Sequence, residues 1–331
     1  MDPSLLRDPA VARRLTVFYH GGCADGVTGA WAVHAALPAE VRAALAALGG
    51  LFGRGHPAAE PALQLRRAGA VFHGLGHGDP APPAELVAGR HVVYVDIAPP
   101  AAVGAAVAAA AATLTVLDHH RSAQAVVAAL GAAPARPFAA VYAEDRSGAQ
   151  IAWDWAHAGA PRPWFVDYVG DRDLYTFRLP ASRAVSKAMF VEGLTRGFGP
   201  LDALRAMRGR PGAAPGALAT RGAAYLRYEE QVVSRLAAAA WPATVTAGDP
   251  PREYAVRVVN TAVLVSEVGE AVMAAAPPDV HFALMWVYSH ECDEIWVSAR
   301  TTRDDVDLAR ITPCVAGASP GGGGHARAAG F

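Results

Sequence analysis

Strand-length apolar segments alternate with alanine-rich segments through the first part of this 331-residue chain. The apolar segments are rich in β-branched and aromatic residues, which favour strands, whereas alanine favours helices. This alternation predicts an α/β domain built on a parallel, doubly wound sheet. Strands are predicted at Leu15–His20, Ala70–His73, His91–Asp96 and Leu114–Leu117, and helices between them at Val27–Leu37 and Ala101–Ala112.

The pattern then becomes mainly helical and changes again near Trp241-Pro242. Ser147–His157 is a predicted helix that begins at a Ser able to cap it, and Arg221–Ala240 is predicted to be one long amphipathic helix. We expect an α/β domain at 1–185, a helical connector at 186–240 and a smaller α+β domain at 241–331. Other predicted helices are Pro163–Tyr175, most of Ser182–Ala240 and Ser266–Ala276, and later strands are Tyr254–Val259, Phe282–Tyr288 and Glu294–Ser298.

Charge and cysteine content narrow the function classes and the compartment. The formal net charge of −1 provides no overall positive field for a long nucleic acid tract, although arginine supplies nearly all the basic side chains and suits local phosphate binding. The cysteines Cys23, Cys292 and Cys314 form no CxxC pair and no disulfide framework, as is typical of a reducing cytoplasm. Met1–Arg14 lacks signal-peptide features, and the apolar run Pro100–Leu117 is interrupted by glycine. We expect a soluble cytoplasmic protein without membrane contact.

Acidic and imidazole side chains follow successive predicted strands of the first domain. The first strand ends at His20 and is followed by Asp25, the third ends at Asp96, and the fourth leads into Asp118-His119-His120. Because the carboxyl ends of parallel strands share one edge of a sheet, these groups should converge on one crevice. Asp171, near the end of a later predicted helix, could join them.

A cluster of this composition needs a cation. Carboxylates packed together without one would repel each other and take up protons. Oxygen-rich ligands with some imidazole suit Mn²⁺ or Mg²⁺, and Fe²⁺, Co²⁺ and Zn²⁺ are alternatives. Taken singly, a strand-end Asp is more often a helix cap or a turn residue, and a single His is usually structural. Several such residues at equivalent topological points favour a metal site.

These motifs, in this order, resemble the DHH phosphoesterase superfamily, in the subgroup that carries a C-terminal DHHA1 domain. The resemblance covers nearly the whole chain, and the combination of Asp-His-His with a C-terminal Gly-Gly-Gly-His is its most specific part. Within the superfamily, the segments around Cys23 and Asp171 are most similar to the oligoribonuclease (nanoRNase) and cyclic-nucleotide phosphodiesterase branch. The matching segments are His20–Gly26, Val95-Asp96, Asp118-His119-His120, Gly170–Asp173 and Gly322–Phe331.

The resemblance implies a role for each matching residue. Asp96 would bridge to a second ion that His20 also binds. His120 would face the substrate phosphate, and Asp118 would orient an imidazole from behind. The implied ligands of one complete metal site are Asp25, Asp96, His119 and Asp171. The implied substrate-binding residues of the second domain are Arg300, Gly322, Gly323, Gly324 and His325.

Cys23 departs from the superfamily pattern, in which many members have an Asp at this position and a His one residue further upstream. A thiolate ligand would favour softer ions such as Zn²⁺ or Fe²⁺, whereas a neutral thiol would act as a small apolar side chain. Whether one or two ions bind therefore stays open at this point.

The resemblance implies a metal-dependent phosphodiesterase, with Mn²⁺ as the expected ion, that hydrolyses dinucleotides and short oligoribonucleotides to mononucleotides. Alternative substrates are a cyclic mononucleotide, a cyclic dinucleotide, phosphoadenosine phosphate and polyphosphate, which the motifs do not separate. An alternative from another class is a nucleotide-binding regulator with weak catalysis, which Cys23 keeps open. A homodimer is one compatible assembly.

Overall fold

The computed structural model describes residues 1–48, 61–76, 78–132, 137–206, 215–248, 250–290, 293–315 and 323–330. The chain divides into two compact units, Met1–Tyr225 and Leu226–Phe331. Each unit contains its own sheet and its own buried apolar clusters. Among the described residues, no helix has both the length and the apolar character needed to cross a lipid bilayer.

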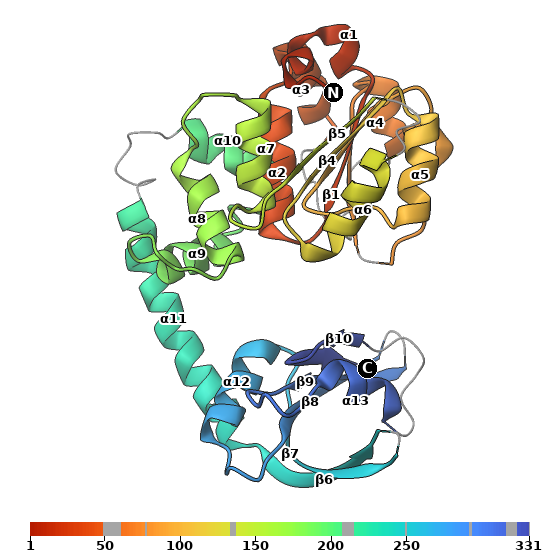
Figure 1. Ribbon diagram of the computed structural model, residues 1–331. Coiled ribbons are helices and arrows are strands. Elements are labelled where there is room, and N and C mark those ends of the chain that lie inside the picture. The colour runs from red at the N-terminus through yellow and green to blue at the C-terminus, as the bar shows by residue number, and fades with distance from the viewer. Residues whose placement is uncertain are drawn as a thin grey trace. The chain divides into compact units, whose positions relative to one another are not determined.

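The sheet of the first unit has five strands, all parallel, in the order β2-β1-β3-β4-β5 (Figure 1). The predicted parallel sheet is thus confirmed. Its last strand was not predicted, because a central pair of alanines weakens the strand pattern and the strand is only half-buried. The strands are β1 (Leu15–His20), β2 (Val71–Leu75), β3 (His91–Val95), β4 (Thr113–Asp118) and β5 (Phe138–Tyr142).

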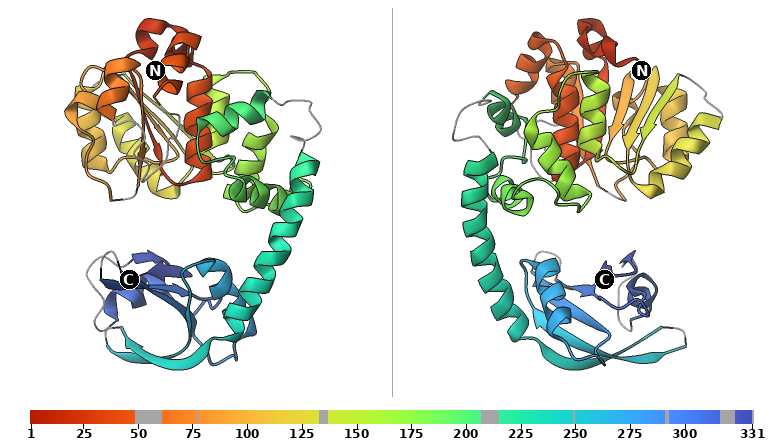
Figure 2. Two further views of the ribbon diagram at one scale, coloured as in Figure 1. Left: turned by 180° about the vertical axis from the view of Figure 1, so that it is seen from behind. Right: turned by 60° about the vertical axis from the view of Figure 1, so that its left-hand side comes forward.

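Helices cover both faces of this sheet, as a doubly wound fold requires (Figures 1 and 2). One face packs against α2 (Ala24–Ala35) and α7 (Gly148–Ala156), and the other against α5 (Ala101–Ala110) and α6 (Arg121–Ala132). The remaining helical segments of this unit are η1 (Pro3–Arg7), α1 (Pro9–Ala12), α3 (Ala39–Ala46), α4 (Pro61–Arg67), η2 (Ala84–Leu86), α8 (Trp164–Asp173), α9 (Ser182–Val191) and α10 (Phe198–Ala206).

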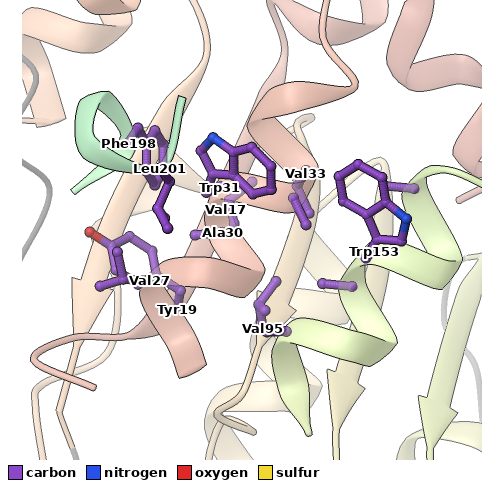
Figure 3. Close-up of a cluster of buried hydrophobic side chains, with 14 of the residues drawn as sticks. Val17, Tyr19, Val27, Ala30, Trp31, Val33, Val95, Trp153, Phe198 and Leu201 are labelled. Atoms are coloured by element: carbon purple, nitrogen blue, oxygen red, sulfur yellow. The ribbon is translucent and has the colours of Figure 1, made fainter. Parts of the chain in front are cut away.

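The larger core of this unit lies between the sheet and the α2–α7 pair (Figure 3). Trp31 of α2 is fully buried, and its ring stacks on that of Trp153 from α7 with the centroids 5.8 Å apart. Val17 of β1 and Val95 of β3 contribute to the same cluster. Burial of a large aromatic side chain contributes roughly 2–3 kcal/mol. This packing fixes α2 and α7 against the strands whose ends carry the polar cluster.

The second unit contains a six-stranded mixed sheet in the order β10-β11-β9-β8-β7-β6. The two short strands β10 and β11 were not predicted, and neither was β6, the first strand of this unit along the chain. Strand β6 contains Pro242 and lies at the sheet edge, where a proline removes no essential ladder hydrogen bond. The strands are β6 (Trp241–Ala247), β7 (Arg252–Asn260), β8 (Phe282–Ser289), β9 (Glu294–Arg300), β10 (Gly323–His325) and β11 (Ala328–Gly330). Its helical segments are α12 (Val265–Ala275), α13 (Leu308–Ile311) and η4 (Thr312–Cys314).

The long helix α11 (Pro215–Ala238) contains the boundary between the two units. It corresponds to the predicted helix Arg221–Ala240 but begins six residues earlier. Its last turns pack against the second unit through Val233, Leu236 and Ala237. The segment 186–240, expected to be a connector, supplies most of α9 and all of α10 to the first unit.

Candidate metal centre

Three neighbouring strands of the first sheet end in polar residues at the same edge. Tyr19 pairs with Val95 across β1 and β3, and Val95 pairs with Leu117 across β3 and β4. The next residue along each of these strands is His20, Asp96 or Asp118. The parallel register therefore brings together side chains that are up to 98 positions apart in the sequence (118 − 20 = 98).

Asp96 lies at the centre of this cluster and is almost fully buried. His119 Nε2 lies 3.1 Å from Asp96 Oδ1, and His20 Nδ1 lies 3.4 Å from Asp96 Oδ2. The Asp96 backbone adopts a left-handed conformation with φ 59°, which costs a non-glycine residue about 1–2 kcal/mol. Its N–H donates to the carbonyl of Leu117 at 2.9 Å. This strained turn directs the Asp96 carboxylate between the imidazoles.

Asp25 comes from the first turn of α2 and faces the start of α7. Its Oδ1 accepts a hydrogen bond from the Ala149 N–H at 3.1 Å, while its Oδ2 lies 4.0 Å from His119 Nε2. This Oδ2 is buried and has no hydrogen-bond partner among the described residues. A buried carboxylate oxygen without a donor is costly unless a cation neutralises it.

The start of α7 approaches the cluster closely because residue 148 is glycine. A Cβ at Gly148 would lie 2.6 Å from the Asp96 Cβ and 2.9 Å from Asp25 Oδ2. The helix begins at Ser147, the residue predicted to cap it, and a capping box with Gln150 confirms that prediction. Helix α7 thus seals one side of the cluster with backbone rather than side chains.

The end of α8 contributes Asp173 rather than the expected Asp171. Asp173 Oδ2 lies 3.3 Å from His119 Nε2, and its side chain is 23% exposed. Asp171 instead accepts hydrogen bonds from Thr176 Oγ1 at 2.6 Å and from the N–H groups of Arg178 and Leu179. The structure therefore places Asp171 outside the cluster, as the residue that holds the loop after α8.

The Asp118-His119-His120 triplet divides into three different environments. Asp118 Oδ1 accepts from the backbone N–H of His119 at 2.7 Å and of His120 at 3.0 Å, and it lies 2.8 Å from His120 Nδ1. The His119 side chain is 11% exposed and is turned into the cluster, whereas the His120 side chain is 37% exposed. Asp118 thus orients His120, and His120 is the imidazole that a ligand can reach.

The electrostatics of the cluster depend on burial. Burial raises the pKa of Asp25 and of Asp173, and the negative charge of Asp96 raises both further. Burial acts on Asp96 in the same direction, but hydrogen bonds from His119 and His20 lower its pKa to about 2. The pKa of His20 is raised by its hydrogen bond to Asp96, and that of His120 by Asp118. The carboxylates thus repel one another, and a divalent cation would remove that repulsion.

Among the residues that the structure describes, the potential ligand atoms fall into three overlapping groups, and within each group they lie within 4.8 Å of one another. Asp96 belongs to two of these groups, as does His119, so the arrangement fits one ion or two ions that share a carboxylate. Cys23 extends the cluster beside His20, and burial raises the pKa of its thiol to about 11. The groups are His20-Cys23-Asp96, Asp96-His119-His120 and Asp25-His119-Asp173.

In the second unit, Arg300 and the glycine segment belong to one sheet. His325 pairs with Ala328 across β10 and β11, and Ala328 pairs with Arg300 across β11 and β9. Arg300 is half-buried and its guanidinium donates to Ser266 Oγ at 2.9 Å. Gly323 and Gly324 form β10 with His325, whereas Gly322 lies outside the described residues.

Comparison with known proteins found similar chains rather than a defined family. No family model matches the sequence. The uncharacterized protein R106 of Acanthamoeba polyphaga mimivirus is 22% identical over 219 residues, which are 66% of this chain and 47% of that protein. The chain thus spans about half the length of the curated relative that it matches.

The search of solved structures found matches that cover nearly the whole chain at low sequence identity. RecJ from Thermus thermophilus in complex with Mn²⁺ has a TM-score of 0.45 at 16% identity, with 99% of this chain and 51% of RecJ covered. The pGpG-specific phosphodiesterase PggH from Vibrio cholerae has a TM-score of 0.44 at 12% identity, with 96% of this chain and 92% of PggH covered. The α/β unit followed by a smaller mixed-sheet unit is the architecture that the DHH resemblance implied.

Proposed function

We propose that this chain is a metal-dependent phosphoesterase that hydrolyses a phosphodiester bond in a nucleotide substrate. One observation carries the proposal: carboxylates and imidazoles gather around the buried Asp96 at the carboxyl edge of a parallel sheet. This is the position at which such sheets bind ligands. The oxygen-rich donor set suits a hard divalent cation, and the orphaned Asp25 Oδ2 points to the same ligand.

The residues of the cluster have distinct parts in the proposed reaction. A bound divalent ion supplies a water that is nucleophilic near neutral pH and a positive charge beside the phosphate. Asp25, Asp96, His119 and Asp173 would hold this ion, with Asp173 in place of the expected Asp171. His20 would bind a second ion shared with Asp96. His120, which Asp118 orients and which remains accessible, donates a hydrogen bond to a phosphate oxygen as negative charge develops there.

We further propose that the substrate is a short oligoribonucleotide or dinucleotide and that Mn²⁺ is the working ion. The net charge of −1 supports a short substrate, because long polymers require an extended positive surface. Arg300, the segment Gly322–Gly324 and His325 are proposed to bind the far end of the substrate. A fork-shaped guanidinium and closely approached backbone N–H groups both suit phosphate.

The test is turnover of a dinucleotide by the purified protein after metal removal and addition of Mn²⁺. We expect Asp96→Asn to abolish turnover and to lower the bound metal content, because it removes the shared carboxylate. Asp145→Asn is the matched control, since the Asp145 side chain is 88% exposed and lies outside the cluster. Normal turnover by Asp96→Asn would overturn the proposal, and tight nucleotide binding without any turnover by the unaltered protein would support a regulator instead.

A further inference from the structure

Exposed aromatic and basic side chains are interspersed on the segment that begins at the end of α8, beside the metal cluster. The segment runs from the end of α8 to the residues after α9. We call it the α8–α9 surface and define it by six side chains in 172–196. They are Arg172, Tyr175, Phe177, Arg183, Phe190 and Arg196.

The first part of this surface consists of one arginine and two aromatic rings. The Arg183 guanidinium carbon lies 3.9 Å from the ring centroid of Phe177 and 5.5 Å from that of Tyr175. The two rings meet edge to face with the centroids 4.8 Å apart. Tyr175 is 64% exposed, so most of this aromatic side chain faces solvent.

The second part is centred on Phe190, which is 53% exposed. The guanidinium carbons of Arg172 and Arg196, both exposed residues, lie 5.9 Å and 5.8 Å from its ring centroid, and the ammonium of the buried Lys187 lies 5.9 Å from it. An exposed phenylalanine surrounded by cations gains little from the fold itself. Such an arrangement is typical of a binding surface rather than of a core.

The local charge differs from that of the whole chain. The segment 172–196 contains four exposed arginines, which are Arg172, Arg178, Arg183 and Arg196, whereas its one lysine, Lys187, is buried. Its acidic residues are Asp173, which belongs to the metal cluster, and Glu192, whose carboxylate accepts two hydrogen bonds from Arg221. A local excess of positive charge in a chain with net charge −1 therefore favours an anionic partner.

The loop that carries Tyr175 and Phe177 is held in a strained conformation. Tyr175, Phe177 and Ala181 have φ of 55°, 47° and 53°, in the left-handed region that non-glycine residues avoid. Asp171 fastens this loop through its hydrogen bonds to residues 176–179. The aromatic pair is thus presented in a fixed orientation rather than on a freely moving loop.

We propose that the α8–α9 surface binds a single-stranded oligonucleotide, whose bases stack on Tyr175 and Phe190 and whose phosphates contact the arginines. Exposed rings interleaved with cations match this partner, because an unpaired base offers a flat face and each linkage offers one negative charge. An acidic peptide offers negative charge but no flat ring to stack on the exposed aromatic side chains. A duplex offers both, but its bases are already stacked on one another and cannot stack on the protein. The inference deepens the proposed function, since it adds nucleotides beyond the one that is cleaved.

The test is binding, measured by fluorescence anisotropy with metal-free protein so that hydrolysis does not interfere. The probes are labelled oligo(dT) and oligo(U) of about ten nucleotides, a size typical of single-strand sites, compared with a labelled dinucleotide. We expect both long probes to bind more tightly than the dinucleotide. Equal affinity for the two long probes would place recognition in stacking and phosphate binding, and preference for oligo(U) would add recognition of the 2′-hydroxyl.

Substitutions separate stacking from general charge attraction. We expect Phe190→Ala to weaken long-probe binding about 5- to 100-fold, as loss of one stacked base typically does, and Phe190→Tyr to retain it. Arg172→Gln with Arg196→Gln should flatten the salt dependence, by about 0.7 in the log–log slope for each phosphate that the protein no longer neutralises. Tyr228→Ala is the matched control, because Tyr228 is 71% exposed and lies outside this surface.

The outcomes distinguish this inference from the proposed function. Phe190→Ala should hydrolyse a dinucleotide as well as the unaltered protein does, since Phe190 does not belong to the metal cluster. Long probes that bind no better than the dinucleotide, or that bind Phe190→Ala normally, would overturn the inference even if turnover is confirmed. Equally tight binding of polyglutamate would also overturn it, in favour of general anion attraction. If the protein binds long probes more tightly than the dinucleotide but hydrolyses neither, the inference holds and the proposed function is wrong.

Discussion

At the scale of single residues, the cluster depends on where each carboxylate points. Asp171 and Asp173 are two positions apart near the end of α8, so their side chains leave the helix roughly 200° apart. Asp173 therefore faces His119, while Asp171 faces the loop that follows the helix. Two neighbouring acidic residues that look interchangeable in the sequence have separate roles in the fold.

We expect Asp173→Asn to change metal binding and Asp171→Asn to change stability, although both substitutions make the same chemical change. Asp173→Asn should lower the affinity for Mn²⁺ at least about tenfold, because it removes a ligand carboxylate, while it leaves the fold intact. Asp171→Asn should leave the affinity unchanged but lower the free energy of unfolding by about 1–3 kcal/mol, because it weakens three hydrogen bonds to the loop. Calorimetric metal titration and thermal unfolding measure the two effects. The reverse result would restore Asp171 as the ligand.

Cys23 should influence which metal the site prefers. If its thiolate binds an ion beside His20, the Co²⁺-loaded protein should show a sulfur-to-cobalt charge-transfer band in the near ultraviolet, and Cys23→Ser should lose it. Cys314→Ser is the matched control and should keep the band, because Cys314 is exposed and lies outside the cluster. An identical cobalt spectrum in Cys23→Ser would show that the thiol only fills space.

At the scale of elements, the start of α7 lies directly against two carboxylates of the cluster. Asp25 accepts a hydrogen bond from the N–H of Ala149, and Gly148 lies against Asp96, so the backbone of α7 contacts both carboxylates. The N-terminus of a helix favours negative charge. The helix thus stabilises the ionised cluster and closes it from one side without adding a side chain.

Gly148→Ala should therefore damage the site, whereas Gly199→Ala should not. The added methyl at position 148 would lie 2.6 Å from Asp96 Cβ, and overpacking of this kind costs about 1–3 kcal/mol. At Gly199 in α10 a Cβ meets no atom within 4 Å, so alanine should stabilise the helix by about 0.5–1 kcal/mol. Thermal unfolding together with metal content measures both. Unchanged metal binding by Gly148→Ala would indicate that α7 can move away from the cluster.

At the scale of the whole molecule, the candidate ligands come from five separate places in the first unit. They end β1, follow β3 and β4, or belong to the start of α2 and the end of α8, so an ion would join five segments of the first unit. The second unit has its own sheet and core. Metal binding should therefore stabilise the first unit selectively.

We expect Mn²⁺ to raise the stability of the first unit by about 2.7 kcal/mol when free metal exceeds its Kd about a hundredfold. Hydrogen exchange should slow most at the ends of β1, β3 and β4 and at the start of α7, with little change in β7 or β8. Calcium at the same concentration is a useful comparison, because its larger coordination number suits the small site poorly. Equal protection of both units by Mn²⁺ would contradict the assignment of the site to the first unit alone.

The sequence alone determined the parallel sheet, its edge of polar strand ends and the Ser147 cap. These follow from local pattern, because strand composition is read over a few residues and parallel strands present their carboxyl ends together. Tertiary structure decided the choice of Asp173 over Asp171, the strained turn at Asp96 and the α8–α9 surface, because each depends on how the backbone and side chains settle after packing. The segments of β5 and β6 have residues that favour a strand only weakly. Each forms a strand because it pairs with a neighbouring strand, β4 for β5 and β7 for β6.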